Sequence, residues 1–131
     1  MKVLALDFGR ARTGVAVSDP TGTIARPLGT VERAATEDGL RELADLVAAQ
    51  GVERVVVGLP LTLRGDRGEQ AEETERFVEA LGARLDVPVV TFDERFTTQL
   101  AQQTSAVGDE DARAAAHLLS GYLAWSSGAP A

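Results

Sequence analysis

The sequence predicts a mixed α/β fold, in which three antiparallel strands come first and strands joined by helical crossovers follow. Two observations predict this order. Residues 2–31 contain three short apolar segments separated by turn residues, with no helical pattern between them. From residue 36 onward, segments with a helical period alternate with nearly continuous apolar runs, which are typical of parallel strands. We therefore expect a five-stranded mixed sheet flanked by helices.

The first three strands are expected to form a meander, because the turns between them are short. The turn at 19–22 reads Asp-Pro-Thr-Gly, with proline and glycine at positions that turns favour. Pro27 makes the third strand an edge strand or a broken one, since proline cannot donate to a strand ladder. The three strands cover residues 2–8, 14–18 and 23–31, and a turn covers residues 9–13.

Helices and parallel strands alternate in the rest of the chain. The first helix begins at Thr36 or Glu37 and ends near Gly51, a residue type that commonly closes helices. The later elements are a buried strand at 52–58, a glycine-punctuated loop at 59–68, a helix at 69–85, a second buried strand at 87–92, a short helix at 97–105 and a long helix at 109–125. We expect one domain over residues 1–125 and a flexible tail at 126–131.

An aspartate stands at the end of the first predicted strand. Side-chain alternation puts Asp7 on the same face as Val3 and Ala5, where a core residue is expected. A buried carboxylate normally pairs with another group, takes up a proton or binds a metal, because an unpaired buried charge is costly. The alternative is that the strand has ended and Asp7 only begins the turn at Gly9. This segment alone leaves the two interpretations about even.

Further acids follow the last strand and begin the last helix. Asp93 and Glu94 come directly after the strand, and Asp111 lies on the core-facing side of the helix. The carboxyl ends of parallel strands meet at one edge of a sheet, where ligands bind. Converging carboxylates need a cation, and oxygen ligands favour Mg²⁺ or Mn²⁺, which in pairs about 3.5–4 Å apart support phosphodiester hydrolysis. The alternative is a scatter of surface acids, in a chain with 20 of them.

Composition limits the classes of function. The formal net charge of −7 argues against a broad electrostatic surface for nucleic acid. No cysteine is present, which excludes disulfides and thiolate metal sites. No apolar run is long enough for a signal peptide or a membrane span, so we expect a cytoplasmic location and no membrane partner. The second helix is expected to present a solvated acidic face made of Glu69, Glu72, Glu73, Glu75 and Glu79.

Five stretches occur in a recognisable order: LALDFGRARTGVAVSD at 4–19, ARPL at 25–28, VVVGLPLTLRG at 55–65, FDERFTT at 92–98 and DARAAAHLL at 111–119. Each stretch alone is a weak signal, whereas the ordered set is specific. Together they resemble the YqgF family, the Holliday junction resolvase or pre-16S ribosomal RNA maturation nuclease family. The resemblance covers nearly the whole chain, as far as Tyr122.

This resemblance implies a ribonuclease H-like fold and a divalent-metal-dependent nuclease. The reaction implied is hydrolysis of phosphodiester bonds with Mg²⁺ or Mn²⁺, in 5′-end maturation of pre-16S ribosomal RNA, in cleavage of structured DNA such as Holliday junctions, or in both. The catalytic acids map onto Asp7, Asp93, Glu94 and Asp111. The metal ligands map onto Asp7, Asp111 and either Glu94 or Asp93. The residues implied to orient carboxylates or contact phosphate are Arg95, Thr97 and Thr98, and for the threonines capping of the short helix is an equal alternative.

The segment before the last aspartate departs from the family pattern. Family members commonly carry lysine or arginine there, whereas residues 105–110 read SAVGDE. Because phosphate contacts supply most non-specific affinity, this departure argues against tight binding of a four-way DNA junction. The arginines that remain as candidates for phosphate contacts are Arg10, Arg12, Arg64 and Arg67.

Two other functions fit parts of the sequence. One is a non-catalytic nucleic-acid or ribosome-associated module with the same fold, which the net charge favours and the retained acids oppose. The other is a fragment of an actin-like ATPase, whose phosphate-binding entry the first hairpin also resembles, although such enzymes need two large domains. For the nuclease, the expected partners are an RNA precursor or structured DNA, together with ribosomal particles. We expect a monomer or a weak homodimer.

Overall fold

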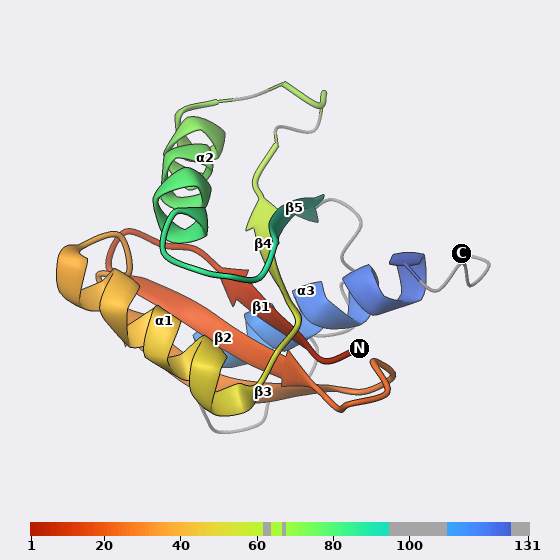
Figure 1. The fold of residues 1–131 in the computed structure, drawn as a ribbon. Coiled ribbons are helices and arrows are strands. Elements are labelled where there is room, and N and C mark those ends of the chain that lie inside the picture. Colours follow the sequence, from red (N-terminus) through yellow and green to blue (C-terminus); the bar gives the residue numbers. More distant parts are fainter. Residues whose placement is uncertain (62–63, 67, 95–109, 127–131) are drawn as a thin grey trace.

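A five-stranded sheet with the order β3-β2-β1-β4-β5 forms the centre of the molecule (Figure 1). The computed structural model describes residues 1–61, 64–66, 68–94 and 110–126. The antiparallel strands are β1 (Val3–Asp7), β2 (Arg12–Ser18) and β3 (Ala25–Glu32). The parallel strands are β4 (Arg54–Leu59), which pairs with β1, and β5 (Val89–Asp93), which pairs with β4. The expected mixed sheet is therefore confirmed.

The bounds of all five strands differ from the predicted ones by one or two residues, and two strands differ in ways that the structure explains. β2 begins two residues earlier than expected, because the buried side chain of Thr13 closes the turn onto Gly9, where its Oγ1 lies 3.4 Å from the amide nitrogen. β5 is not the fully buried strand predicted, because it is the edge strand of the sheet. Its residues Val89 and Val90 are half-buried, and Thr91 is exposed.

The third strand behaves as its proline predicts. β3 forms the other edge of the sheet, and its pairing with β2 is irregular between Val15 and Ala16, where Pro27 pairs with Ala16. An edge strand needs fewer backbone donors than a central one, so proline is tolerated there.

Three helices connect and follow the strands. α1 (Glu37–Gln50) begins after Thr36, whose Oγ1 accepts a hydrogen bond of 3.2 Å from the amide of Gly39, and it ends at Gly51 in the left-handed conformation. α2 (Glu69–Gly82) ends three residues before the predicted end, because Ala83 and Arg84 form a turn instead. α3 (Glu110–Ser126) is the last helix. The short helix predicted at 97–105 lies outside the described residues.

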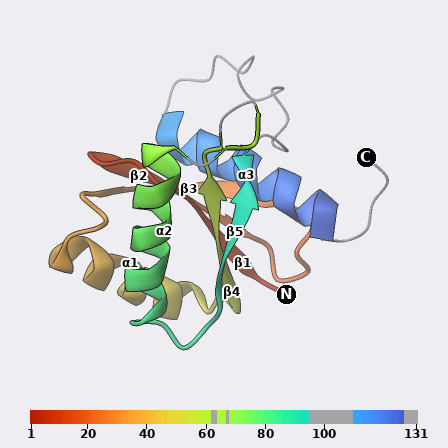
Figure 2. The same ribbon diagram turned by 90° about the horizontal axis from the view of Figure 1, so that it is seen from above.

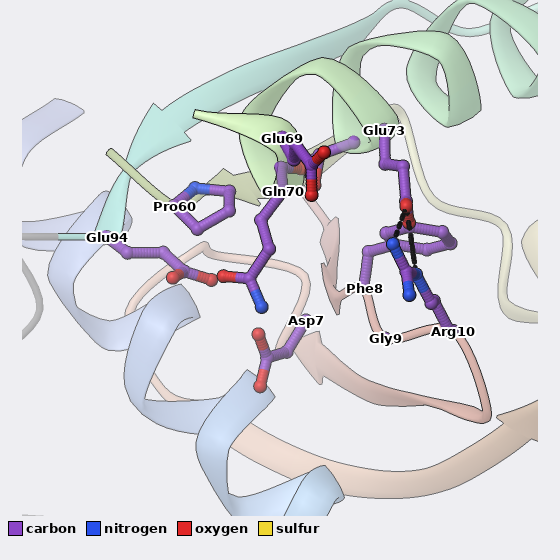
Figure 3. Close-up of a pocket in the computed structure, with 10 residues that line it drawn as sticks. Asp7, Phe8, Gly9, Arg10, Pro60, Glu69, Gln70, Glu73 and Glu94 are labelled. Atoms are coloured by element: carbon purple, nitrogen blue, oxygen red, sulfur yellow. Dashed lines mark hydrogen bonds and ion pairs between the residues drawn. The ribbon is translucent and has the colours of Figure 1, made fainter. Parts of the chain in front are cut away.

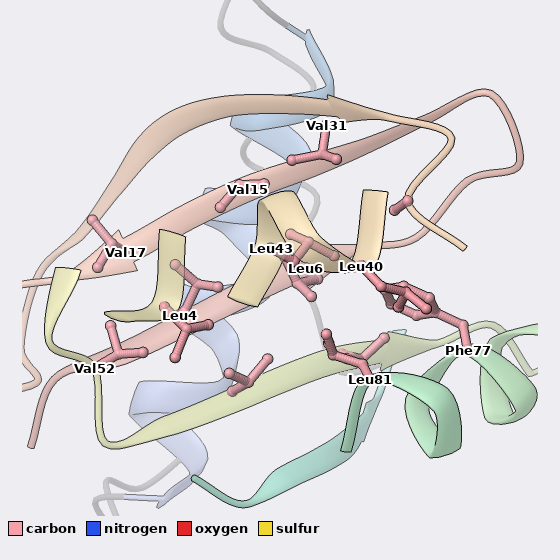
Figure 4. Packing of buried hydrophobic residues seen from close by; sticks show 14 residues of the cluster. Leu4, Leu6, Val15, Val17, Val31, Leu40, Leu43, Val52, Phe77 and Leu81 are labelled. Atoms are coloured by element: carbon pink, nitrogen blue, oxygen red, sulfur yellow. The ribbon is translucent and has the colours of Figure 1, made fainter. Parts of the chain in front are cut away.

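The helices form layers on both faces of the sheet (Figures 1 and 2). α1 and α2 cover one face, where Leu4 and Leu6 of β1 pack with residues such as Leu43 and Phe77 (Figure 4). α3 covers the other face, where it packs on Val3 and Ala5. Alternation along β1 thus divides the core as predicted, and it directs Asp7 toward the α3 side.

No helix in the described part of the chain is both long enough and apolar enough to cross a membrane.

Candidate active site

Two of the predicted acids, Asp7 and Glu94, come together at the carboxyl edge of the sheet. Asp7 ends β1 and Glu94 follows β5, so the two residues reach this edge from strands that flank β4. Both line a pocket of about 590 Å³, and Figure 3 shows their carboxylates on the same side of it. The parallel part of the sheet therefore brings together residues that are far apart in the sequence.

A glycine in the strand between them makes room for Glu94. A Cβ atom added at Gly58 of β4 would lie 2.8 Å from Glu94 Oε1 and 3.0 Å from Leu118 Cδ2. Such short distances mean that the Glu94 side chain occupies the space directly over β4, beneath α3. Because Gly58 has no side chain, the Glu94 carboxylate has room to lie against β4.

The electrostatics of this pair favour a shared proton or a cation. Burial raises the pKa of Glu94 to about 7, and the charge of Asp7, a hydrogen bond to Asp7 and the charge of Asp93 raise it as well. Burial also raises the pKa of Asp7, and this effect is partly offset by the hydrogen bond with Glu94 and reinforced by the charge of Asp111. Two half-buried carboxylates in contact cannot both ionise freely, since like charges repel. A divalent cation between them would remove that penalty.

The third acid, Asp111, comes from the first turn of α3. Its backbone lies so close to β2 that a Cβ atom added at Gly14 would be 1.8 Å from the Asp111 carbonyl oxygen. Gly14 is the residue that pairs with Asp7 across the β1–β2 ladder. The absence of a side chain at Gly14 therefore lets the start of α3 approach the sheet beside Asp7.

Asp111 is held there by an arginine. Arg12 Nε lies 3.0 Å from Asp111 Oδ2, and both side chains are partly exposed, at 65% and 37%. Among the described residues, no three acidic or histidine side chains are close enough together to hold a metal ion. Of the three predicted metal ligands, the structure therefore brings Asp7 and Glu94 together, whereas Asp111 is near enough to influence the pKa of Asp7 and is paired with Arg12.

The turn after β1 carries a second arginine, which pairs with the opposite helix. Arg10 Nε lies 2.8 Å and 2.9 Å from the two carboxylate oxygens of Glu73 on α2. Next to it, the rings of Phe8 and Phe77 stack with their centroids 4.3 Å apart. The turn is therefore fastened to α2 by one ion pair and one aromatic contact.

One sequence expectation about α2 is wrong in part. Glu69 and Glu73 were expected on a solvated face, and Glu69 is exposed, whereas Glu73 is half-buried as the partner of Arg10. Both residues line the pocket (Figure 3). Gln70, which the sequence analysis did not single out, also lines the pocket and points its side chain toward Asp7 and Glu94. Helical periodicity identifies the core face of α2, and it carries no signal for contacts with a turn 60 residues earlier in the chain.

The other predicted residues divide into two groups. Asp93 ends β5, outside the residues that line the pocket, so Glu94 is the one of the two acids that faces Asp7. Arg64 lies exposed in the loop after β4. Outside the described residues lie Arg67, Arg95, Thr97 and Thr98.

Comparisons with known proteins concern the family and the fold of the chain. The family model described as "RuvX: Holliday junction resolvase" matches residues 1–125. A "Putative pre-16S rRNA nuclease" of Chloroflexus aggregans is 52% identical over 101 residues, which cover 77% of this chain and 71% of the relative. A protein of the same name from Desulforamulus reducens is 36% identical over 132 residues, with coverage of 94% and 96%.

A solved structure titled "T. thermophilus RuvC in complex with Holliday junction substrate" matches 98% of this chain and 96% of its own, with a TM-score of 0.64 and 15% identity. At this identity the likeness concerns the fold, and it confirms the expected ribonuclease H-like class. The family model and the relatives confirm the expected class of enzyme, a nuclease. The chain therefore belongs to the RuvX Holliday junction resolvase family, which is the YqgF family that its motifs resemble.

Proposed function

We propose that this nuclease depends on a divalent cation and that Asp7 and Glu94 hold it. The observation that carries the proposal is the contact between these two carboxylates at the carboxyl edge of the sheet, with the pKa of both raised. Their oxygen donors suit Mg²⁺ or Mn²⁺, since Mg²⁺ is commonly bound through one or two carboxylates together with water and substrate phosphate.

The residues around the pair have distinct parts in this proposal. When bound, the cation supplies Lewis-acid stabilisation of charge on the phosphodiester group. Asp7 and Glu94 would hold the cation through their carboxylates, and because metal ligands must be deprotonated, cation binding is expected to strengthen as the pH rises. Asp111, at the start of α3, is the third acid within electrostatic range of Asp7. Arg10, in the turn after β1, and Arg12, the first residue of β2, are candidates to bind the phosphates of the substrate.

For the substrate, we propose the 5′ end of precursor 16S ribosomal RNA. The names of the similar bacterial proteins support an RNA precursor, whereas the family description supports a DNA junction. Two features of this chain favour RNA over a large junction. Its net charge is −7, and two of the candidate phosphate-binding arginines, Arg10 and Arg12, are each paired with an acid. A cytoplasmic site of action, ribosomal particles as partners and a monomeric or weakly dimeric state complete the proposal.

The test is cleavage of a matched panel with Mg²⁺ or Mn²⁺. The panel contains a precursor 16S RNA end, an unrelated single-stranded RNA, a single-stranded DNA and a four-way junction. Asp7→Asn and Glu94→Gln are expected to abolish cleavage, because each removes a charged cation ligand. Asp45→Asn, an equal change of charge at an exposed position on α1, is the matched control and is expected to cleave normally.

Each outcome has a definite meaning. Cleavage of the RNA end that is lost in both site variants and kept in the control supports the proposal. Preference for the junction would keep the metal site and replace the substrate. A folded protein that binds these nucleic acids and cleaves none of them would replace the enzyme with the non-catalytic module.

A further inference from the structure

The ion pair between Arg12 and Asp111 joins a candidate phosphate-binding residue to a candidate metal ligand. The two charged groups approach within 3.0 Å, and both side chains are accessible to solvent. As long as they are paired, the Asp111 carboxylate is neutralised by a cation of the protein itself. A metal ion and Arg12 therefore compete for the same carboxylate.

The backbones on both sides of this pair are fixed, so an exchange of partners needs only side-chain movement. Arg12 is the first residue of β2 and pairs with Glu32 of β3 in the sheet. Asp111 lies in the first turn of α3, which is held against β2 at Gly14. Releasing the ion pair therefore leaves the Asp111 carboxylate within electrostatic range of Asp7 and the Arg12 guanidinium accessible to solvent.

We propose that Arg12 is a positioning residue that couples cation binding to phosphate binding. In the free protein Arg12 holds Asp111. A cation that takes Asp111 releases the guanidinium to a substrate phosphate, and a phosphate that takes the guanidinium releases Asp111 to the cation. Each ligand thus breaks the Arg12–Asp111 ion pair, so that the other ligand no longer has to break it. The cation must therefore tighten phosphate binding by the same factor by which phosphate tightens cation binding. This inference rests on the proposed function, because it assumes a cation bound at Asp7.

Arg10 provides a matched comparison for this idea. It lies in the turn that leads to Arg12, and its partner is Glu73 on α2, which is outside the set of acids expected to bind the cation. Arg10→Gln and Arg12→Gln remove the same charge from neighbouring positions. A general electrostatic effect of the turn predicts similar changes in metal affinity for the two variants, whereas the exchange predicts a change specific to Arg12.

The experiment measures Mn²⁺ binding through the electron paramagnetic resonance signal of free Mn²⁺, with and without a single-stranded phosphorothioate RNA that resists cleavage. For the unmodified chain, we expect the RNA to tighten Mn²⁺ binding. Arg12→Gln is expected to bind Mn²⁺ alone about two- to fivefold more tightly, the scale of an exposed ion pair, and to lose the enhancement by RNA. Because Arg10 is also a candidate phosphate-binding residue, the RNA is supplied at a saturating concentration for each variant. Arg10→Gln is then expected to keep the affinity for Mn²⁺ alone and the enhancement, since its partner Glu73 is outside the set of acids expected to bind the cation.

Asp111→Asn completes the cycle, because in its background Arg12→Gln is expected to have no effect on Mn²⁺ affinity. Damage to the fold cannot mimic the main result, since it would weaken Mn²⁺ binding. The inference is overturned if Arg12→Gln binds Mn²⁺ no more tightly than the unmodified chain, or if Arg10→Gln has the same effect. Failure of the proposed function looks different, because then neither the unmodified chain nor Asp7→Asn binds Mn²⁺.

Discussion

Replacing Gly14 with alanine tests the geometry that brings α3 to the active site. The new Cβ atom would lie 1.8 Å from the Asp111 carbonyl oxygen and 2.4 Å from its carbonyl carbon. Both are backbone atoms, so no side-chain rotation relieves the overlap. The first turn of α3 has to move away from β2.

The size of the movement and its cost follow from these distances. Ordinary van der Waals contact begins near 3.4 Å, so the α3 backbone must shift by about 1.6 Å. Overpacking of this kind costs about 1–3 kcal/mol, which lowers the melting temperature by roughly 3–15 °C for a chain of this size. The same shift carries Asp111 away from Asp7, and misplacement of a catalytic group by about 1 Å lowers activity on the order of 100-fold.

The assays are thermal melting and metal-dependent cleavage, performed with Gly29→Ala as the control. Gly29 lies on the neighbouring strand β3, and a Cβ atom added there meets nothing within 4 Å. We expect this variant to melt within about 1 kcal/mol of the unmodified chain, since only the flexibility of the unfolded state changes. A Gly14→Ala protein with unchanged melting and cleavage would refute the close approach of α3 to β2.

Three further predictions concern other parts of the molecule. Gly58→Ala is expected to displace the Glu94 side chain and to press on the buried side chain of Leu118, so cleavage should fall about 10- to 100-fold and stability by about 1–3 kcal/mol. Unchanged cleavage would contradict the close approach of Glu94 to Gly58. The pKa of Glu94 is raised from 4.5 to about 7 in the folded protein, so the metal-free folded state binds more protons than the unfolded state between these two pH values. The free energy of unfolding, measured with urea, should therefore decline as the pH rises from about 4.5 to above 7. Asp7→Asn should flatten that decline, and an unchanged slope would contradict the pairing. Thr36→Ala removes the cap on the Gly39 amide and should cost about 0.5–2 kcal/mol in urea unfolding with normal cleavage, while Thr36→Ser should restore stability.

The order and type of the elements could be predicted because they depend on local patterns. Alternating residues in β1 placed Leu4 and Leu6 on one face and Val3 and Ala5 on the other, as the two cores confirm. Thr36 and Gly51 marked the ends of α1 through chemistry that acts within a few residues. The strand at the sheet edge was the exception. An apolar run indicates a strand, but it does not indicate whether further strands pair with both of its edges. β5 was therefore expected to be more buried than it is.

The candidate site was predictable only where a residue ends an element. Asp7 and Glu94 stand at the ends of parallel strands, and parallel pairing brings such ends to one edge whatever the intervening sequence. Nothing local distinguished Asp93 from Glu94, because the choice depends on which of two successive side chains turns toward Asp7. The acidic and phosphate-contacting roles assigned by resemblance remain predictions until the variants are measured.

By itself, then, the sequence identified the family through the resemblance of its ordered motifs. It also determined the mixed sheet, the two core faces of β1 and the acids at the strand ends, because these follow from residue type and short-range spacing. Only the tertiary structure decided the partners of Arg12 and Arg10. It also decided that Gly14 leaves room for the start of α3 and that Gly58 leaves room for Glu94. The physical reason is distance along the chain. These contacts join residues on separate elements, and they depend on how closely packed backbones approach one another, which no periodicity in the sequence records.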